Sequence, residues 1–238
     1  MKKPVLILAA VLLLAAVLLP AFFNREAPPE NTEPETTAAA APMTTGPVGG
    51  VVEFPWVAED GALRIDSLFS FTGFNPDQEE ASCSNAMALI VTNVSQEHLE
   101  NGALTIIMES GGQARFRIED LPAGQSAMIF ELDSQPLGES DRCAAVYAQL
   151  RLLPQTPLLA DKIGIQTEGT MVTLTNLTGS DLTDLTVYCH CLLDTEYFGG
   201  LTYTYSIDSL GAGESLRFDA ADCYMGEAAV VKITQADQ

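Results

Sequence analysis

The chain has 238 residues, with 32 Asp and Glu against 11 Lys and Arg, which gives a formal net charge of -21. Hydrophobic residues nevertheless make up 47% of it. This apolar content excludes a wholly disordered acidic chain, because such a chain cannot bury a core. The negative charge argues against binding of nucleic acid or anionic lipid headgroups, since both repel a polyanion.

Residues 1–23 combine two lysines with a long apolar run. Lys2 and Lys3 precede 19 uncharged residues, Val5 to Phe23. As a helix this run spans roughly 28 Å, close to the thickness of the hydrocarbon core of a bilayer. The positive-inside rule then places the N-terminus in the cytoplasm and the remainder of the chain outside the cell membrane. We predict a single-pass transmembrane helix. A cleaved signal peptide is the alternative, although the two phenylalanines that end the run fit a cleavage site poorly.

Residues 24–50 have a different composition, with five prolines and almost no large apolar residues. A segment of this kind cannot bury a core, so we predict a disordered, extended linker. All 32 acidic residues and nine of the 11 basic residues lie in residues 24–238. The exported part therefore carries a net charge of -23.

From Val51 onward, short β-like runs alternate with Gly, Asn and Pro at spacings of about ten residues, a pattern typical of β-sandwiches. The predicted strand regions are 63–71, 86–94, 104–109, 114–118, 127–132, 144–153, 163–167, 171–176, 185–192, 202–207, 216–220 and 228–234. No helix is predicted after residue 23. We predict an all-β chain with two tandem immunoglobulin-like β-sandwich domains, residues 51–157 and 158–238.

The two series of strands resemble two copies of one unit. The run 88–95 (ALIVTNVS) aligns with 171–178 (MVTLTNLT), and 118–126 (IEDLPAGQS) aligns with 207–215 (IDSLGAGES). An Ala-Ala-Val block near the end of each copy completes the match. Because Gly follows a strand at the same place in both copies, we predict that Gly124 and Gly213 adopt positive φ where the chain turns.

These same segments carry a resemblance to known proteins. CSNAMALIVTNVS, LPAGQSAMIFEL, LTNLTGSDLTDLTVYC, GGLTYTYSIDSLGAGES and AAVVKI resemble a group of membrane-anchored proteins from gut clostridia. Members of that group are similar in having an N-terminal membrane segment, a Pro/Thr linker and a duplicated β-rich exterior. The resemblance covers roughly residues 83–235. The resemblance implies an extracytoplasmic location and a β-rich fold. Its matching segments are turns and strands, and they imply no catalytic or binding residues.

Five cysteines lie in the predicted exterior, where disulfides persist: Cys83, Cys143, Cys189, Cys191 and Cys223. We predict a Cys83–Cys143 bridge in the first unit and a bridge from Cys223 to either of the other two in the second. The Cys-His-Cys step at 189–191 also allows a redox thiol or a metal site. On a strand, however, the two sulfurs face one side and the imidazole the other, which disfavours a shared metal ion.

No catalytic motif or cofactor-binding motif occurs in the sequence. We expect His98, in a polar stretch between two strands, to be a solvent-exposed surface residue. Tyrosines cluster at Tyr197, Tyr203 and Tyr205, which suits a protein or carbohydrate contact surface, although packing in the sandwich explains the last two equally well.

The function that these features favour is a non-enzymatic interaction or scaffold module of the cell envelope. Its partner would be an envelope protein or carbohydrate, and no cofactor or metal is predicted. The alternative is a divalent-cation-dependent carbohydrate-binding module or surface enzyme that uses acidic residues. The acidic candidates are Asp181, Asp184, Asp194, Glu196, Asp219 and Asp222.

Overall fold

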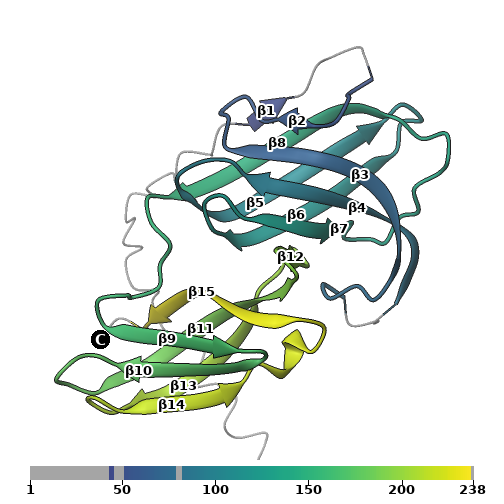
Figure 1. The fold of residues 1–238 in the computed structure, drawn as a ribbon. Coiled ribbons are helices and arrows are strands. Elements are labelled where there is room, and N and C mark those ends of the chain that lie inside the picture. The colour runs from purple at the N-terminus through teal and green to yellow at the C-terminus, as the bar shows by residue number, and fades with distance from the viewer. Residues whose placement is uncertain (1–42, 46–50, 79–81, 237–238) are drawn as a thin grey trace, which may run out of the picture. The chain divides into compact units, whose positions relative to one another are not determined.

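A computed structural model describes residues 43–45, 51–78 and 82–236 (Figure 1). All of these residues belong to one compact unit. The predicted membrane helix, residues 1–23, and most of the predicted linker lie outside the described residues. Within the described ranges, no helix is long and apolar enough to cross a membrane.

The described chain is all-β, as predicted, and its one helical element is a short 3-10 turn, Ala221–Cys223. The strands are β1 Met43–Thr45, β2 Trp56–Val57, β3 Leu63–Gly73, β4 Cys83–Asn93, β5 His98–Met108, β6 Gln113–Leu121, β7 Ser126–Phe130, β8 Cys143–Leu153, β9 Ile163–Glu168, β10 Met171–Asn176, β11 Leu182–Leu193, β12 Glu196–Phe198, β13 Tyr203–Leu210, β14 Ser215–Asp219 and β15 Glu227–Gln235. Every predicted strand region overlaps an observed strand. The sequence pattern missed the three short strands β1, β2 and β12.

The strands pair in the same order twice. In the first repeat, Leu63–Leu153, β4 pairs with β3 and β7, and β5 pairs with β6 and β8. In the second repeat, Ile163–Gln235, β10 pairs with β9 and β14, and β11 pairs with β13 and β15 (Figure 1). Each repeat therefore offers two antiparallel sets of three strands with one shared topology, which agrees with the duplication read from the sequence.

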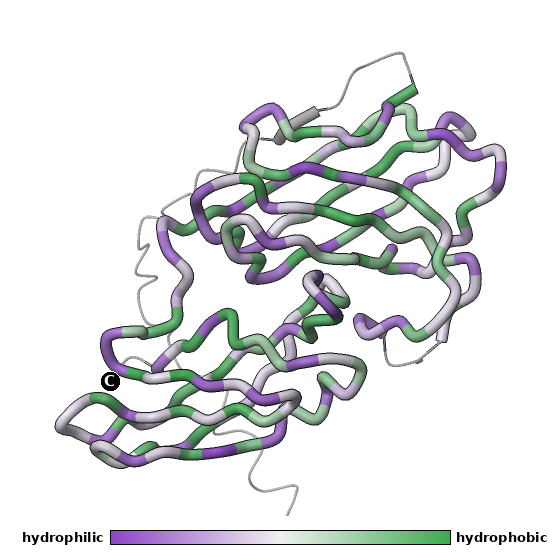
Figure 2. The backbone as a smooth tube through the Cα atoms, viewed as in Figure 1, coloured by the Kyte–Doolittle hydropathy of each residue, from purple (hydrophilic) through white to green (hydrophobic). Residues whose placement is uncertain are grey.

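Apolar residues alternate with polar ones along the strands (Figure 2). The buried apolar side chains form two cores. The first core includes Leu89, Leu104 and Phe116, and the second includes Val172, Leu174 and Val187. Each core also takes side chains from the other repeat: Tyr197 joins the first, and Phe130 joins the second. The two repeats therefore bury apolar surface against each other.

A buried asparagine closes a turn at the same place in each repeat. Asn93 Nδ2 donates to the carbonyls of Glu97 (2.8 Å) and Leu121 (2.9 Å), and its Oδ1 accepts from the amide and hydroxyl of Ser95. Asn176 makes the same four contacts, donating to Ser180 O (2.8 Å) and Leu210 O (2.9 Å) and accepting from Thr178. The Thr-Asn step that identified the duplication thus has a structural cause.

The Gly turns match in the same way. Gly124 has φ 74° and Gly213 has φ 71°, so the prediction of positive φ at both positions is confirmed. Residues other than Gly are strained at positive φ. Gly124 thereby lets the chain turn from β6 in one sheet into β7 in another, and Gly213 does the same between β13 and β14.

One short segment of the predicted linker forms a strand. Met43–Thr45, within residues 24–50, pairs antiparallel with β8, in register with Tyr147–Gln149. These three residues of the predicted linker are therefore extended and paired, and the other linker residues lie outside the described ranges. The physical reason is that the outer edge of β8 offers free backbone donors and acceptors, which an extended segment satisfies.

Strand β12 connects the two repeats. It follows β11 through a tight turn, pairs antiparallel with the end of β11, and pairs parallel with β7 of the first repeat. The residues after it continue this contact, since Gly199 N donates to Met128 O (2.9 Å) and Glu119 N donates to Gly200 O (2.7 Å). One sheet therefore runs through both repeats, in the order β13-β11-β12-β7-β4-β3-β2.

Candidate functional site

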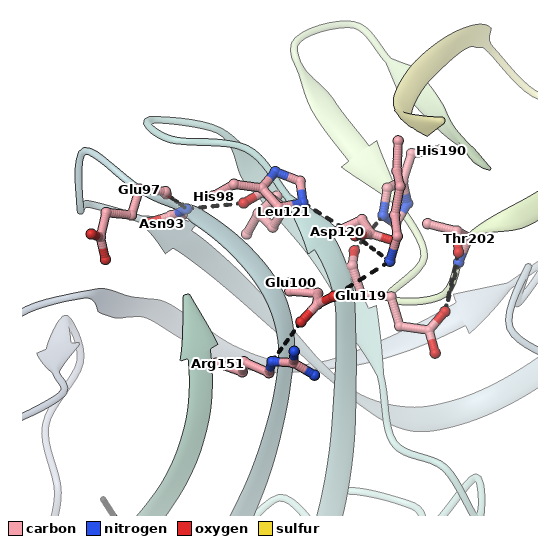
Figure 3. Close-up of polar contacts among 11 residues, drawn as sticks. Asn93, Glu97, His98, Glu100, Glu119, Asp120, Leu121, Arg151, His190 and Thr202 are labelled. Atoms are coloured by element: carbon pink, nitrogen blue, oxygen red, sulfur yellow. Dashed lines mark hydrogen bonds and ion pairs between the residues drawn. The ribbon is translucent and has the colours of Figure 1, made fainter. Parts of the chain in front are cut away.

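A buried polar cluster lies where β5 and β6 of the first repeat meet β11 and β15 of the second (Figure 3). It contains both histidines of the chain, His98 and His190, together with Glu100, Asp120 and Lys232. Polar and charged groups are costly to bury without partners, so the contacts within this cluster determine whether it stabilises the fold.

Asp120 is at the centre of this cluster. Its Oδ1 lies 3.1 Å from His98 Nε2 and 3.4 Å from Lys232 Nζ, and its side chain is only 4% exposed. The backbone at Asp120 has φ 46°, a conformation that Asp tolerates better than most residues. This turn of the backbone places both Asp120 and Leu121 on buried sites at the end of β6. The carboxylate is therefore held between an imidazole and an ammonium group.

Two carboxylates face each other across this strand pair. The register of β5 and β6 places Glu100 opposite Asp120, an arrangement that is destabilising when uncompensated. Lys232 Nζ compensates it by contacting Glu100 Oε1 at 3.7 Å as well as Asp120, and it lies 4.9 Å from the Tyr188 ring centroid. Arg151 Nε pairs with Glu100 Oε2 at 2.7 Å. The second repeat thus supplies a cation that the first repeat needs.

His190 makes a second polar contact between the repeats. Its Nε2 lies 2.7 Å from the carbonyl of Glu119, so Nε2 carries the hydrogen and donates. The ring stacks on Tyr197 with centroids 4.9 Å apart. Burial lowers the pKa of His190, against the raising effect of the Glu119 carbonyl. The imidazole is therefore neutral at physiological pH and acts as a hydrogen-bond donor and stacking surface.

A third contact joins Asp77 of the first repeat to the loop after β12. Gly200 N donates to both carboxylate oxygens of Asp77, at 2.8 and 3.0 Å, and Leu201 N donates at 3.1 Å. The backbone of Gly200 approaches the first repeat so closely that an added Cβ would lie 2.1 Å from Arg117 O. Glycine is required here for that approach. Nearby, Glu119 Oε2 accepts from Thr202 N and Oγ1 (Figure 3).

The ionisation of Asp77 gives a testable pH dependence. Burial raises the pKa of Asp77 from 3.8 to about 6, while the amides of Gly200 and Leu201 act in the opposite direction. The folded chain thus holds this proton more tightly than the unfolded chain. Its contribution to stability is full below the unfolded pKa and is lost as pH rises through about 6.

We therefore expect the free energy of unfolding of the wild type, minus that of the Asp77→Asn variant, to fall between about pH 4 and pH 7. Asn cannot titrate, so the difference isolates this one carboxyl group. Urea unfolding of both proteins at each pH measures it. A difference that stays constant or rises over this range would contradict the assignment.

The predicted disulfides are absent from the structure: all five cysteines are free thiols. Cys143 is buried in the first core, whereas Cys83 is half-buried at the start of β4 and outside that core. The two thiols therefore face different surroundings. Cys189, Cys191 and Cys223 lie together in the second core, with the side chains of the last two in contact.

The three thiols of the second core behave as core residues. Burial raises the pKa of Cys189 to about 12, which disfavours the thiolate that a redox site needs. Cys189 and Cys191 face the second core while His190 faces the first repeat, as expected for a strand. Among the residues that the structure describes, no group of three or more His, Cys, Asp or Glu could hold a metal ion.

The three tyrosines predicted as a contact surface lie in different surroundings. Tyr197 is 7% exposed and belongs to the first core, so its side chain contributes little to the exposed surface. Tyr203 and Tyr205 are half-buried against the second core. Tyr203 donates to Pro76 O (3.1 Å), and Tyr205 donates to Asp222 Oδ2 (2.8 Å).

Sequence reasoning missed most of this site. His98 was expected on the surface, but it is 1% exposed and contacts Asp120, so that prediction is wrong. The polar neighbours of His98 indicated solvent, whereas the ring is covered because β5 begins at His98. One signal could have found part of the site. Asp120 lies within the aligned segment 118–126, where the second copy has the uncharged Ser209, and Lys232 comes shortly after the Ala-Ala-Val block of the second copy.

Comparisons with known proteins identify no relative. No protein-family profile and no curated protein matches the chain. Among solved structures, a calcium-binding mutant of Bacteroides uniformis beta-glucuronidase 2 is similar at 11% identity and TM-score 0.14, over 80% of this chain and 27% of that one. A beta-glucuronidase from glycoside hydrolase family 2 has 7% identity and TM-score 0.15, over 84% and 26%.

The Bacteroides enzyme bound to a cyclophellitol-6-carboxylate aziridine is similar at 11% identity and TM-score 0.14, over 84% of this chain and 28% of that one. This chain therefore spans about a quarter of the length of these enzymes. Likeness at this level carries no inference about activity, so the function has to be argued from the chain itself.

Proposed function

We propose that the chain is a membrane-anchored, extracytoplasmic protein whose two tandem immunoglobulin-like β-sandwich domains, 51–157 and 158–238, act as a non-enzymatic interaction or scaffold module. Its partner is a protein or carbohydrate of the cell envelope. The apolar run of residues 5–23 after Lys2 and Lys3 supports the anchor and the outward orientation. The resemblance to membrane-anchored proteins of gut clostridia supports the same compartment.

The observation that carries the proposal is the junction between the repeats. Its buried ionisable groups have partners within the chain. Asp120 contacts His98 and Lys232, and Asp77 accepts hydrogen bonds from backbone amides. Groups held in this way fix two sandwiches as one stable surface. General acid–base catalysis instead needs such groups within reach of a substrate. The geometry supports a binding scaffold better than a reaction centre.

The proposal predicts a stable neighbour in the envelope. Acidic residues number 32 against 11 basic ones, so carboxylate-reactive cross-linkers applied to the full chain in its native membrane give the best coverage. We expect mass spectrometry to recover one envelope protein reproducibly, or the chain to co-sediment with isolated envelope polysaccharide. Failure of both measurements, with the chain intact in the membrane, would contradict the proposal.

Calcium provides a test against the alternative function. A cation-dependent carbohydrate binder or surface enzyme would be stabilised by the ion that it binds. The scaffold proposal predicts no change in melting temperature when millimolar calcium is added to the full chain. A rise of several degrees would favour the alternative instead.

A further inference from the structure

The second repeat has an open groove whose equivalent in the first repeat is occupied by the chain itself. It lies between β13 and β14, opens to solvent and has a volume of about 570 Å³. Apolar side chains line it, namely Ile207, Leu216 and Phe218, and the exposed carboxylates of Asp208 and Asp219 stand at its rim. A groove with an apolar base and a charged rim is a common form of peptide-binding site.

The equivalent space in the first repeat is filled. There, β6 and β7 correspond to β13 and β14, and the segment 196–200 of the second repeat lies between them. This segment pairs with β7 through Tyr197, in register with Ala127, and it accepts a hydrogen bond from Glu119 N of β6 at Gly200 O (2.7 Å). The chain therefore contains one occupied example of this groove.

The side chains that line the occupied groove are less exposed than their counterparts in the second groove. In the first repeat the four side chains that line it are at most 1% exposed: Phe116, Ile118, Ala127 and Ile129. Their counterparts at an offset of 89 residues are Tyr205, Ile207, Leu216 and Phe218. Ile207 is 7% exposed, and the other three are only half-buried. The second groove leaves apolar surface uncovered that the first covers.

Backbone groups along the second groove are also available. Among the described residues, β13 pairs only with β11, and β14 pairs only with β10. Their facing edges therefore carry donors and acceptors without strand partners, which is the arrangement that an added strand satisfies. In the first repeat β12 supplies that strand to β7.

We propose that the groove between β13 and β14 binds an extended segment of a partner protein, parallel to β14, as the segment 196–200 binds between β6 and β7. This inference rests on the proposed interaction function and names its surface. The partner segment carries small residues where it crosses the groove, and basic residues lie on either side of them.

Each of these features follows from a contact. In the occupied groove, a Cβ on Gly200 would lie 2.1 Å from Arg117 O, and Ser206 holds the equivalent position on β13. A partner segment needs glycine at this crossing for the same close approach. The rim residues Asp208 and Asp219 are both acidic and exposed, so basic flanks complement them.

The test uses a peptide taken from the chain itself. The probe is EYFGGLT, the sequence of Glu196–Thr202, flanked by two lysines on each side and labelled with a fluorophore. Binding to the full chain is followed by fluorescence anisotropy, and we expect a dissociation constant below about 1 mM. A peptide with both glycines replaced by valine is the matched control and should bind at least about tenfold more weakly.

Variants of the protein locate the site. Asp208→Lys with Asp219→Lys should weaken binding of the glycine peptide about tenfold. The charge-matched control, Glu59→Lys with Glu109→Lys, alters exposed residues outside the second repeat and should leave binding unchanged. Equal binding to the two variants, or no binding of the glycine peptide at about 1 mM, would overturn the proposal.

Two further outcomes separate this proposal from others. A concentration-dependent dimer that the Asp208→Lys and Asp219→Lys changes abolish would show that a second copy of the chain occupies the groove, which overturns the partner segment. If the envelope neighbour still cross-links to this variant, the proposed function stands while the groove assignment fails. Loss of that same cross-link supports both.

Discussion

Replacing Lys232 by Met is expected to lower the free energy of unfolding by about 3 kcal/mol. Lys232 is the cation that contacts both Asp120 (3.4 Å) and Glu100 (3.7 Å). Without it, two carboxylates remain opposed across β5 and β6, and one of them is only 4% exposed. The loss comes from leaving buried charge uncompensated, because Met fills a similar volume. Urea unfolding followed by circular dichroism measures the change.

Lys162→Met is the matched control, because no ion pair involves Lys162 among the described residues. We expect that change to cost less than about 0.5 kcal/mol. Adding Asp120→Asn to Lys232→Met should recover part of the lost stability, since it removes one of the two opposed carboxylates. Equal costs for the two lysine variants would show that the cluster contributes nothing to the junction.

Replacing either buried asparagine by Ala is expected to cost about 3 kcal/mol, and the two costs should be similar. Asn93 and Asn176 each make four hydrogen bonds, two as donor and two as acceptor. Alanine removes the side-chain donor to buried carbonyls, including that of Leu121. The single Trp56, 8% exposed in the first core, reports unfolding of that core by fluorescence, and circular dichroism of the β-sheets reports unfolding of both repeats.

Two controls separate the hydrogen bonds from the size of the side chain. Asn93→Asp keeps the acceptor for Ser95 but replaces the donor by an oxygen that faces two carbonyls, so it should be at least as destabilising as Ala. Asn101→Ala changes an exposed asparagine on β5 and should cost less than about 0.5 kcal/mol. If Asn93→Asp retained wild-type stability, the donor contacts would not matter.

The repeated elements of the fold were predictable, because each has a local cause. Alternating apolar residues mark the long strands, and the glycines at 124 and 213 mark turns that need positive φ. The Thr-Asn steps identified the duplication because Asn93 and Asn176 occupy the same turn. Signals of this kind depend only on residues near one another in the sequence.

The candidate site was not predictable for the opposite reason. Asp120 and Lys232 are far apart in the sequence, and neither pattern nor composition indicates that they meet. Strand β12 has three residues, too few for a period-2 signal. The Gly199-Gly200 step lies outside the predicted strand at 202–207, and nothing near it in the sequence indicates that Gly200 makes a close backbone approach to Arg117. Contacts between repeats produce no periodic pattern in the sequence.

The pairing of β12 with β7 has a consequence for how the chain can be divided. Strand β7 has β4 on one side and β12 on the other. A fragment that ended before the second repeat would expose the edge of β7 that β12 covers, Ser126–Met128, next to the buried apolar side chain of Ala127. Edges of this kind recruit strands from other molecules and lead to aggregation. The second repeat therefore protects the first from intermolecular strand pairing, and the two repeats should be expressed together.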